Sequence, residues 1–439
     1  MKKEDKVVKK SLRYSIIDGS FYSLMTGVGH SLIIPFALAM KATNLQIGFL
    51  SSFPDLIAPL SQFATIKAMK HNQRKSLILK AALFQAFMWI PILLIPFIIL
   101  SQGPLVLVLI FSLLALFGSF IGPAWASWIG DLVPEEKRSS FFGTRNKIIG
   151  LVALISTLLA GFFLDKFKAI NKIFLGFAIL FFIAFVARLI SISYIKKMYE
   201  PKFKLEEKYQ FTFWQFIKKA PFNNFGRFTI YFTLINFTAN IASPFFTVYM
   251  LKSLNFSYAQ YTIAGFVSAI SGLLIMSQIG KIGDKYGNIS IIKISGFLIP
   301  FVPLLWLLTK NFYLILLIQI FSGIAWAAFN LSSSNFYFDS TSPQRRAACL
   351  TYLNVLTGIG VFLGGILGGY LSTTIKLNFD SILVLFIISG ILRLATSLIF
   401  IPMLKEIRDT PKVNLIHTFE SIVAQNFFKF THLPLKKKP

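Results

Sequence analysis

The chain has 439 residues, of which 55% are hydrophobic and 14% charged, and its mean hydropathy is +0.69. These values exclude a set of ordinary soluble domains and indicate a membrane protein. Apolar runs near the ~20 residues needed to cross a bilayer recur from end to end, and they are continuous runs rather than the short alternating strands of a membrane barrel.

Twelve segments are predicted to span the membrane as helices, because each is long and apolar enough to cross the hydrocarbon layer. We therefore predict an all-α polytopic membrane protein. The spans lie at roughly residues 14–40, 46–67, 76–100, 103–130, 144–165, 171–195, 227–251, 258–280, 289–309, 311–338, 348–372 and 380–402.

The net charge of +27 comes from basic residues that lie mainly in alternate loops between the spans. If the N-terminus is cytosolic, most Lys and Arg residues fall on the cytosolic side, as membrane topology requires. We therefore predict a multi-pass protein of the cytoplasmic membrane with both termini in the cytosol, and no nucleic-acid partner. Cys349 is the only cysteine, which excludes an internal disulfide bond.

The longest polar interruption divides the chain into two sets of six spans. It predicts an N-terminal bundle at 1–195, a cytosolic linker at 196–226, a C-terminal bundle at 227–402 and a basic cytosolic tail at 403–439. The linker residues Phe211, Trp214, Phe216 and Ile217 favour a short amphipathic helix on the inner leaflet, although a plain linker with aromatic anchors fits equally well. A second amphipathic helix is expected at 413–430.

The two halves repeat each other at a fixed offset, which indicates an internal duplication. Two six-helix halves joined by a long inner loop are the layout of a secondary transporter, whose substrate binds near the midplane while the halves rock. The repeated residues, each pair 208 positions apart, are Asp131 and Asp339, Arg138 and Arg346, Asn146 and Asn354, Gly150 and Gly358, and Gly161 and Gly369.

The sequence "GKIGDKYG" interrupts the apolar pattern between the eighth and ninth spans. Gly280 and Gly283 would let another backbone come close, and Gly287 would let the chain turn with a positive φ. Asp284 could accept hydrogen bonds from a neighbouring helix start and pair with Arg345 or Arg346. These residues and Lys285 are predicted to form a cytosolic gate, against a simpler interpretation as a tight turn with a solvated Asp.

This stretch resembles the loop signature of the major facilitator superfamily, and the helix count, central loop and duplication extend the resemblance to the whole chain. The resemblance implies two pseudo-symmetric six-helix bundles and transport by alternating access. The corresponding loop of the first half, "KAMKHNQRKS", keeps the basic end of the signature at Arg74 and Lys75 but has no Asp. The loop "DLVPEEKRSSFFGTRN" resembles a loop of a poorly characterised prokaryotic branch, and its residues Asp131 and Arg138, with Asp339 in the second half, are expected to clamp helix pairs together.

Ionisable residues within the spans are functional candidates because they are costly in lipid. Asp55 and His30 lie near the midplane and are the proton-coupling candidates, since a carboxylate in a desolvated site takes up a proton more readily. The alternative for Asp55 is a cap on a kink at Pro54 and Pro59, or a bond to a neighbouring helix. Asp18 lies nearer the inner surface, where a solvated or capping role is equally expected.

Family resemblance places the sixth and twelfth helices outside the bundle, so Arg188 and Arg393 are assigned structural roles. The helices that line the cavity in the family supply the substrate candidates, although each alone could equally pack helices. The glycine-rich run "GVFLGGILGG" resembles an antiporter motif but lies in the eleventh helix rather than the fifth, so close helix packing explains it. The cavity candidates are Thr26, Trp125, Asn236, Asn240, Trp326, Asn330 and Asn335.

The predicted function is secondary active transport of a small molecule by alternating access, with protons as a candidate coupling ion. The expected partners are the substrate and membrane lipids, the expected state is a monomer, and no enzyme activity, cofactor or metal is predicted. The alternatives are a membrane enzyme acting on lipid-linked substrates and a sensor with the same fold but no transport. A membrane enzyme would need clustered carboxylates or histidines.

Overall fold

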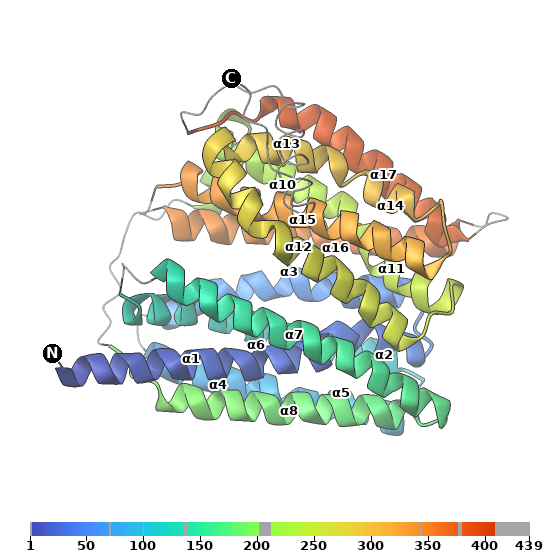
Figure 1. The fold of residues 1–439 in the computed structure, drawn as a ribbon, viewed down its shortest axis with the longest axis horizontal. Helices are drawn as coiled ribbons and strands as arrows, with labels where there is room; N and C mark the ends of the chain where they lie inside the picture. Colours follow the sequence, from blue (N-terminus) through green and yellow to red (C-terminus); the bar gives the residue numbers. More distant parts are fainter. Residues whose placement is uncertain are drawn as a thin grey trace, which may run out of the picture. The chain divides into compact units, whose positions relative to one another are not determined.

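The computed structural model describes residues 2–69, 72–99, 101–134, 138–201, 212–342, 345–375 and 380–408 (Figure 1). In these ranges the secondary structure is helical and contains no strand. The chain forms two compact units. Unit 1 comprises residues 1–209, 236–266 and 350–389, and unit 2 comprises residues 210–235, 267–349 and 390–439.

The first half of the chain contains six long helical segments, two of them interrupted. In unit 1, α1 packs against both α7 and α8, while α6 packs against α3 and α4. The elements are α1 (Lys2–Val28), η1 (His30–Leu32), α2 (Ile33–Ala39), α3 (Asn44–Ala68), α4 (Arg74–Phe87), α5 (Trp89–Ile98), α6 (Gly103–Leu132), α7 (Arg138–Ala169) and α8 (Ile173–Lys197).

The second half repeats this pattern after a short linker helix. The elements are α9 (Phe213–Lys219), η3 (Ala220–Phe222), α10 (Asn224–Asn240), α11 (Ser243–Val248), η4 (Tyr249–Ser253), α12 (Tyr258–Tyr286), α13 (Asn288–Leu298), α14 (Phe301–Leu305), α15 (Phe312–Ser340), α16 (Arg346–Thr374), α17 (Ser381–Phe400) and η5 (Ile401–Met403). Of these, η4 is a single π-helical stretch.

The predicted spans are found as helices in the chain order expected from the sequence. Among the described residues, eleven helical segments are long and apolar enough to cross a membrane. The remaining predicted span is α3, whose 25 residues reach about 37 Å at 1.5 Å per residue and exceed the ~30 Å hydrocarbon layer. Helix α3 is less apolar than the other eleven segments because it carries Ser, Gln and Asp side chains. The all-α polytopic fold is confirmed.

Residues 202–211 of the linker, including Phe211, lie outside the described residues. The following residues form α9, which begins with a capping box at Thr212 and Gln215. Phe216 is buried, whereas Trp214 is 70% exposed, so the short helix presents one aromatic side chain outward. The amphipathic helix predicted at 413–430 lies outside the described residues.

Helix α16 packs closely against two neighbours because glycines line both of its faces. A side chain at Gly364 would meet the backbone carbonyl of Phe237 in α10, and one at Gly368 would meet that of Ile241, which follows α10. On another face, Gly365 lies against Ser52 of α3. Small residues of this kind let membrane helices approach backbone to backbone. The glycine-rich run therefore packs helices together, as the sequence predicts.

Candidate functional site

A cavity of about 500 Å³ lies in unit 1 beside the middle of α3. Asp55 and His30 both line it, so the two proton-coupling candidates face the same space. Its other polar lining residues come from five helices: Tyr22 from α1, Gln62 from α3, Gln85 from α4, Ser119 from α6, and Asn354 and Thr357 from α16. The cavity is mildly polar, and Asp55 is its one carboxylate among these lining residues.

The Asp55 carboxylate has no hydrogen bond or ion pair with the residues that the structure describes. Helix α3 runs unbroken from Asn44 to Ala68 with Pro54 and Pro59 inside it. Because Pro59 has no N–H, the backbone carbonyl of Asp55 lacks its usual helical partner. Gly358 of α16 packs against this carbonyl. The expected alternative role, a side-chain bond to a neighbouring helix, is not made in the described part of the chain.

His30 lies at the break between α1 and α2, where it begins the η1 turn. Its ring centroid is 5.6 Å from that of Trp89 and 5.3 Å from that of Phe111. The Nε2 atom is buried and has no hydrogen-bond partner among the described residues. The aromatic contacts fix the ring, and an unpaired ring nitrogen is free to accept or donate a proton.

A second cavity of about 250 Å³ adjoins the first, because Tyr22 and Gly118 line both. Asp18, Arg145 and Arg188 line this smaller cavity and are at most 8% exposed. The structure therefore differs from the prediction for Arg188, which lies inside the bundle of unit 1 rather than on its outside. Asp18 is likewise buried rather than solvated. The sequence shows that these helices carry ionisable side chains. It does not show which helix faces these side chains occupy.

The seven neutral cavity candidates are dispersed in the structure. Trp125 lines the smaller cavity, and the other six are not among the lining residues of these two cavities. Thr26 bonds within its own helix to Ser23, and the Asn240 side chain bonds to the Asn236 carbonyl. In unit 2, Trp326 lies near Phe329, while Asn330 is exposed and Asn335 half-buried.

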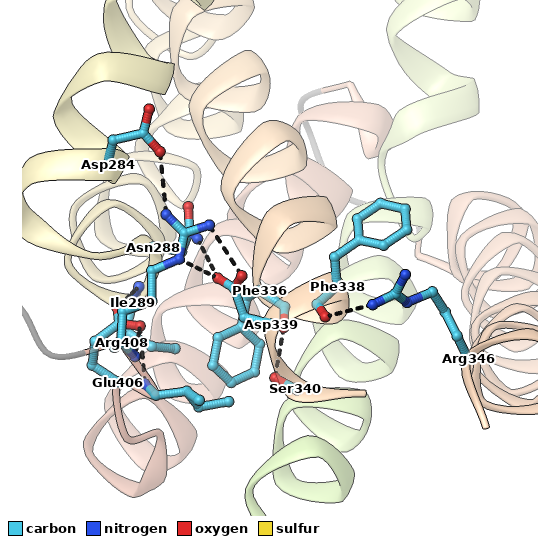
Figure 2. Close-up of polar contacts among 11 residues, drawn as sticks. Asp284, Asn288, Ile289, Phe336, Phe338, Asp339, Ser340, Arg346, Glu406 and Arg408 are labelled. Atoms are coloured by element: carbon cyan, nitrogen blue, oxygen red, sulfur yellow. Dashed lines mark hydrogen bonds and ion pairs between the residues drawn. The ribbon is translucent and has the colours of Figure 1, made fainter. Parts of the chain in front are cut away.

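In unit 2, Asp284 and Asp339 share a single cation, Arg408, which follows the last helix (Figure 2). Arg408 lies 3.2 Å from Asp284 Oδ1 and binds Asp339 through Nε at 2.9 Å and NH2 at 3.0 Å. The hydrogen bond to Asp339 is the main reason that the pKa of Arg408 is raised above its usual value. The predicted partners, Arg345 and Arg346, are thus replaced by a residue 124 positions away.

The glycines of the predicted gate behave differently from one another. Gly287 has φ of 85°, the positive value that a turn at this place requires, and it precedes α13. A side chain at Gly283 would meet Asn288 Oδ1 at 3.1 Å, whereas one at Gly280 would meet no described atom within 4 Å. The close backbone approach predicted at Gly280 is therefore absent from the described structure. Lys285 lies over the ring of Tyr286.

Arg346 begins α16 in unit 2 and contacts the end of α15 rather than Asp284. Its NH2 group donates to the Phe338 carbonyl at 3.3 Å, and its guanidinium lies 5.1 Å from the centroid of the Phe338 ring (Figure 2). It therefore joins two consecutive helices across a short loop.

The two Asp residues of the predicted clamp have equivalent surroundings in the two units. In unit 1, Arg74 at the start of α4 donates to Asp131 at 2.6 Å, and Glu200 accepts from the Lys75 amide at 3.2 Å. In unit 2, Asn288 at the start of α13 donates to Asp339 at 2.8 Å, and Glu406 accepts from the Ile289 amide at 2.8 Å. The side chain of Arg138, the third clamp residue, lies outside the described residues.

Sequence and structure comparisons point to one family. A model of the Major Facilitator Superfamily matches residues 19–309 and again residues 234–432. The chain is 24% identical over 292 residues to the multi-drug resistance efflux pump PmrA of Streptococcus pneumoniae, covering 63% of this chain and 69% of that protein.

Several solved transporters share the fold. A mutant of the nucleoside transporter NupG matches with a TM-score of 0.71 and 17% identity over 90% of this chain and all of that one. An auto-inhibited POT family peptide transporter matches with a TM-score of 0.68 and 10% identity over 92% and 99% of the two chains. The family model, the duplicated halves and the helix order agree, and the chain belongs to the Major Facilitator Superfamily as a secondary transporter of that type.

Proposed function

We propose that this transporter moves a small organic molecule across the cytoplasmic membrane and couples that movement to protons through Asp55. In this proposal the bundles at 1–195 and 227–402 rock against each other, and both termini and the basic tail face the cytosol. The asymmetric distribution of basic residues supports this orientation. We further propose that the protein works as a monomer without cofactor or metal.

The observation that carries the coupling proposal is the position of Asp55. Its carboxylate lines the cavity of about 500 Å³ and has no partner among the described residues. Asp55 is an exposed residue, so its carboxylate is open to the cavity and is not held by a neighbouring helix in the described part of the chain. An unpaired carboxylate beside a cavity can instead gain and lose a proton as access alternates, with His30 on the same cavity as a second titratable group.

The proposed cytosolic gate comprises Gly280, Gly283, Asp284, Lys285, Gly287 and Arg346, to which we add Arg408. Arg408 holds Asp284 and Asp339, so the ends of α12 and α15 are tied through one side chain. A gate needs contacts that can break during the cycle, and the Asp284 carboxylate, 76% exposed, is held by a contact of this weak kind. A clamp role is proposed for Asp131 and Asp339 because each accepts a hydrogen bond from the start of another helix, from Arg74 and from Asn288 respectively. The same role is proposed for Arg138 from its place in the sequence repeat.

The coupling proposal is tested with purified protein in proteoliposomes. A thermal-shift screen first identifies a ligand from nucleosides, peptides and multidrug-pump dyes, the compound classes suggested by the relatives, since binding stabilises the folded state. Accumulation of that ligand is then measured with a pH gradient imposed in either direction.

We expect Asp55→Asn to abolish gradient-driven accumulation while ligand binding and equilibrium exchange persist. The matched control is Gln62→Ala, which changes the same cavity without removing a titratable group and should retain the response to the gradient. Gradient-driven accumulation by Asp55→Asn would remove Asp55 from the mechanism. If the wild-type protein binds the ligand but does not transport it, a sensor without transport becomes the better account. Chemical conversion of the ligand by the protein would favour an enzyme.

A further inference from the structure

The smaller cavity of unit 1 contains more positive than negative charge. Two guanidinium groups, those of Arg145 and Arg188, line it together with one carboxylate, that of Asp18. Their side chains are buried, with 8%, 2% and 4% of the residue surface exposed respectively. With both arginines charged and Asp18 ionised, the three groups leave one positive charge without a counter-charge of their own.

The carboxylate does not pair directly with either guanidinium among the described residues. Instead, Ser191 lies between the groups: it donates to Asp18 Oδ1 at 2.6 Å and accepts from NH1 of Arg188 at 2.9 Å. The Nε atom of Arg188 is buried and has no hydrogen-bond partner in the described part of the chain. Arg188 therefore has an unsatisfied donor, which is rare for a buried group.

Arg145 is held beside this space by its neighbours. Its Nε donates to the Ser15 carbonyl at 3.3 Å, and its guanidinium lies 4.4 Å from the centroid of the Trp125 ring. Gly19 leaves room for it, since a side chain there would meet Arg145 NH2 at 2.6 Å. The Arg188 guanidinium lies similarly over the Tyr22 ring at 4.9 Å. Aromatic faces thus orient both cations without neutralising them.

An uncompensated charge within a membrane-spanning bundle is costly, and an anion bound in the cavity that both arginines line would reduce that cost. Arginine donors match a carboxylate in particular, because two parallel N–H groups can bind its two oxygens. The remaining walls include Trp125, Ile121 and Ile149, which offer apolar surface to the rest of a ligand. The site therefore combines a cationic end with an apolar and aromatic body.

We propose that this cavity binds the carboxylate of an amphipathic organic anion, with Arg145 and Arg188 as its ligands. The inference rests on the proposed transport function, because it names the chemical class of the substrate. A volume of about 250 Å³ that opens beside the larger cavity suits a small molecule better than a lipid with two acyl chains.

The test compares carboxylic acids with their own primary amides. The probes are 2-naphthoate, indole-3-acetate, 4-phenylbutyrate and octanoate, each paired with the neutral amide, and binding to the purified full-length protein is measured by thermal shift and calorimetry. Phosphatidylglycerol and 2-naphthyl phosphate are added as separate arms, which distinguish a lipid headgroup or a phosphate from a carboxylate.

We expect at least one acid to bind and its amide to bind about 10- to 100-fold more weakly, the range for losing hydrogen bonds to a charged group. Arg188→Gln should lose the preference for the acid, and Arg188→Lys should keep part of it because the charge remains. Arg393→Gln is the matched control, since Arg393 is equally buried at 2% exposure in α17 of unit 2 and should leave the preference unchanged.

Asp18→Asn separates a binding role from a structural one. If Asp18 competes with the ligand for the cations, its neutral variant should bind the acid on the order of 10-fold more tightly. Unchanged or weaker binding in Asp18→Asn, equal binding of acids and amides, no binding of any acid, or tighter binding of phosphatidylglycerol or naphthyl phosphate would overturn the proposal. These outcomes leave the Asp55 experiment unaffected, so the two proposals can fail independently.

Discussion

Arg74, which binds Asp131 in unit 1, and Arg408, which binds Asp284 and Asp339 in unit 2, are predicted to contribute unequally to the free energy of unfolding. Arg74→Met removes a side chain that is fully buried and donates to Asp131 at 2.6 Å and to Ser127 at 2.9 Å. Truncating one partner of a buried pair typically costs ~3–5 kcal/mol. The Asp131 side chain is 47% exposed, so water can recover part of its solvation, and we expect a loss of about 2–3 kcal/mol.

Arg408→Met removes an equivalent cation from a more exposed position. The Arg408 side chain is 35% exposed, and its partners Asp284 and Asp339 are 76% and 17% exposed. Solvent screening reduces such pairs to about 1 kcal/mol or less, and we expect a loss of that order. Lys310→Met, which removes an exposed cation between α14 and α15, should change stability by less than ~0.5 kcal/mol.

The assay is unfolding of the purified protein in mixed micelles with increasing SDS, followed by tryptophan fluorescence. A double-mutant cycle of Arg74→Met with Asp131→Asn isolates the direct coupling from other losses. Two results would contradict this prediction: a loss of stability in Arg408→Met as large as in Arg74→Met, or no coupling energy in the double-mutant cycle. Either would show that burial does not set the strength of these arginine–aspartate contacts.

Three further predictions concern topology, packing and the gate. In a Cys349→Ser background, Lys310→Cys should react with a membrane-impermeant thiol reagent in intact cells and Lys281→Cys should not. The reverse pattern would invert the orientation. Cys349 itself is too buried to serve as the labelling site. Gly364→Leu should lower the yield of folded protein while Gly364→Ala lowers it less, because any side chain meets the α10 backbone, and normal yield from both would refute this packing. Asp284→Asn should strongly reduce transport in liposomes while costing less than ~1 kcal/mol of stability, because the carboxylate is exposed; wild-type transport would exclude a gate role.

The local features of the fold could be predicted from the sequence. The twelve spans depend on runs of apolar residues, and the positive φ of Gly287 depends on a turn that few other residues allow. The depth of Asp55 and His30 within their spans could be predicted, since helix length converts sequence distance into depth. Their position at one cavity could not, because it depends on which helix faces meet.

The partners of charged side chains could not be predicted in the same way, because they depend on which helix faces meet. Arg408 reaches Asp284 across 124 positions, and Arg74 reaches Asp131 across 57. Arg188 carried no sequence signal for facing a cavity, since its helix is apolar on all sides. One sequence gives the cost of such a residue but not the direction in which it points.

The central claim, that Asp55 gains and loses a proton in the cavity, is tested most directly by infrared difference spectroscopy of the purified protein. The spectrum is recorded while the buffer is changed from acidic to alkaline, and the carbonyl band of a protonated carboxyl group is followed in the wild type, Asp55→Asn and Asp18→Asn. The account predicts a titrating band that disappears in Asp55→Asn and remains in Asp18→Asn. The same titrating band in Asp55→Asn, or no titrating band in the wild type, would contradict it.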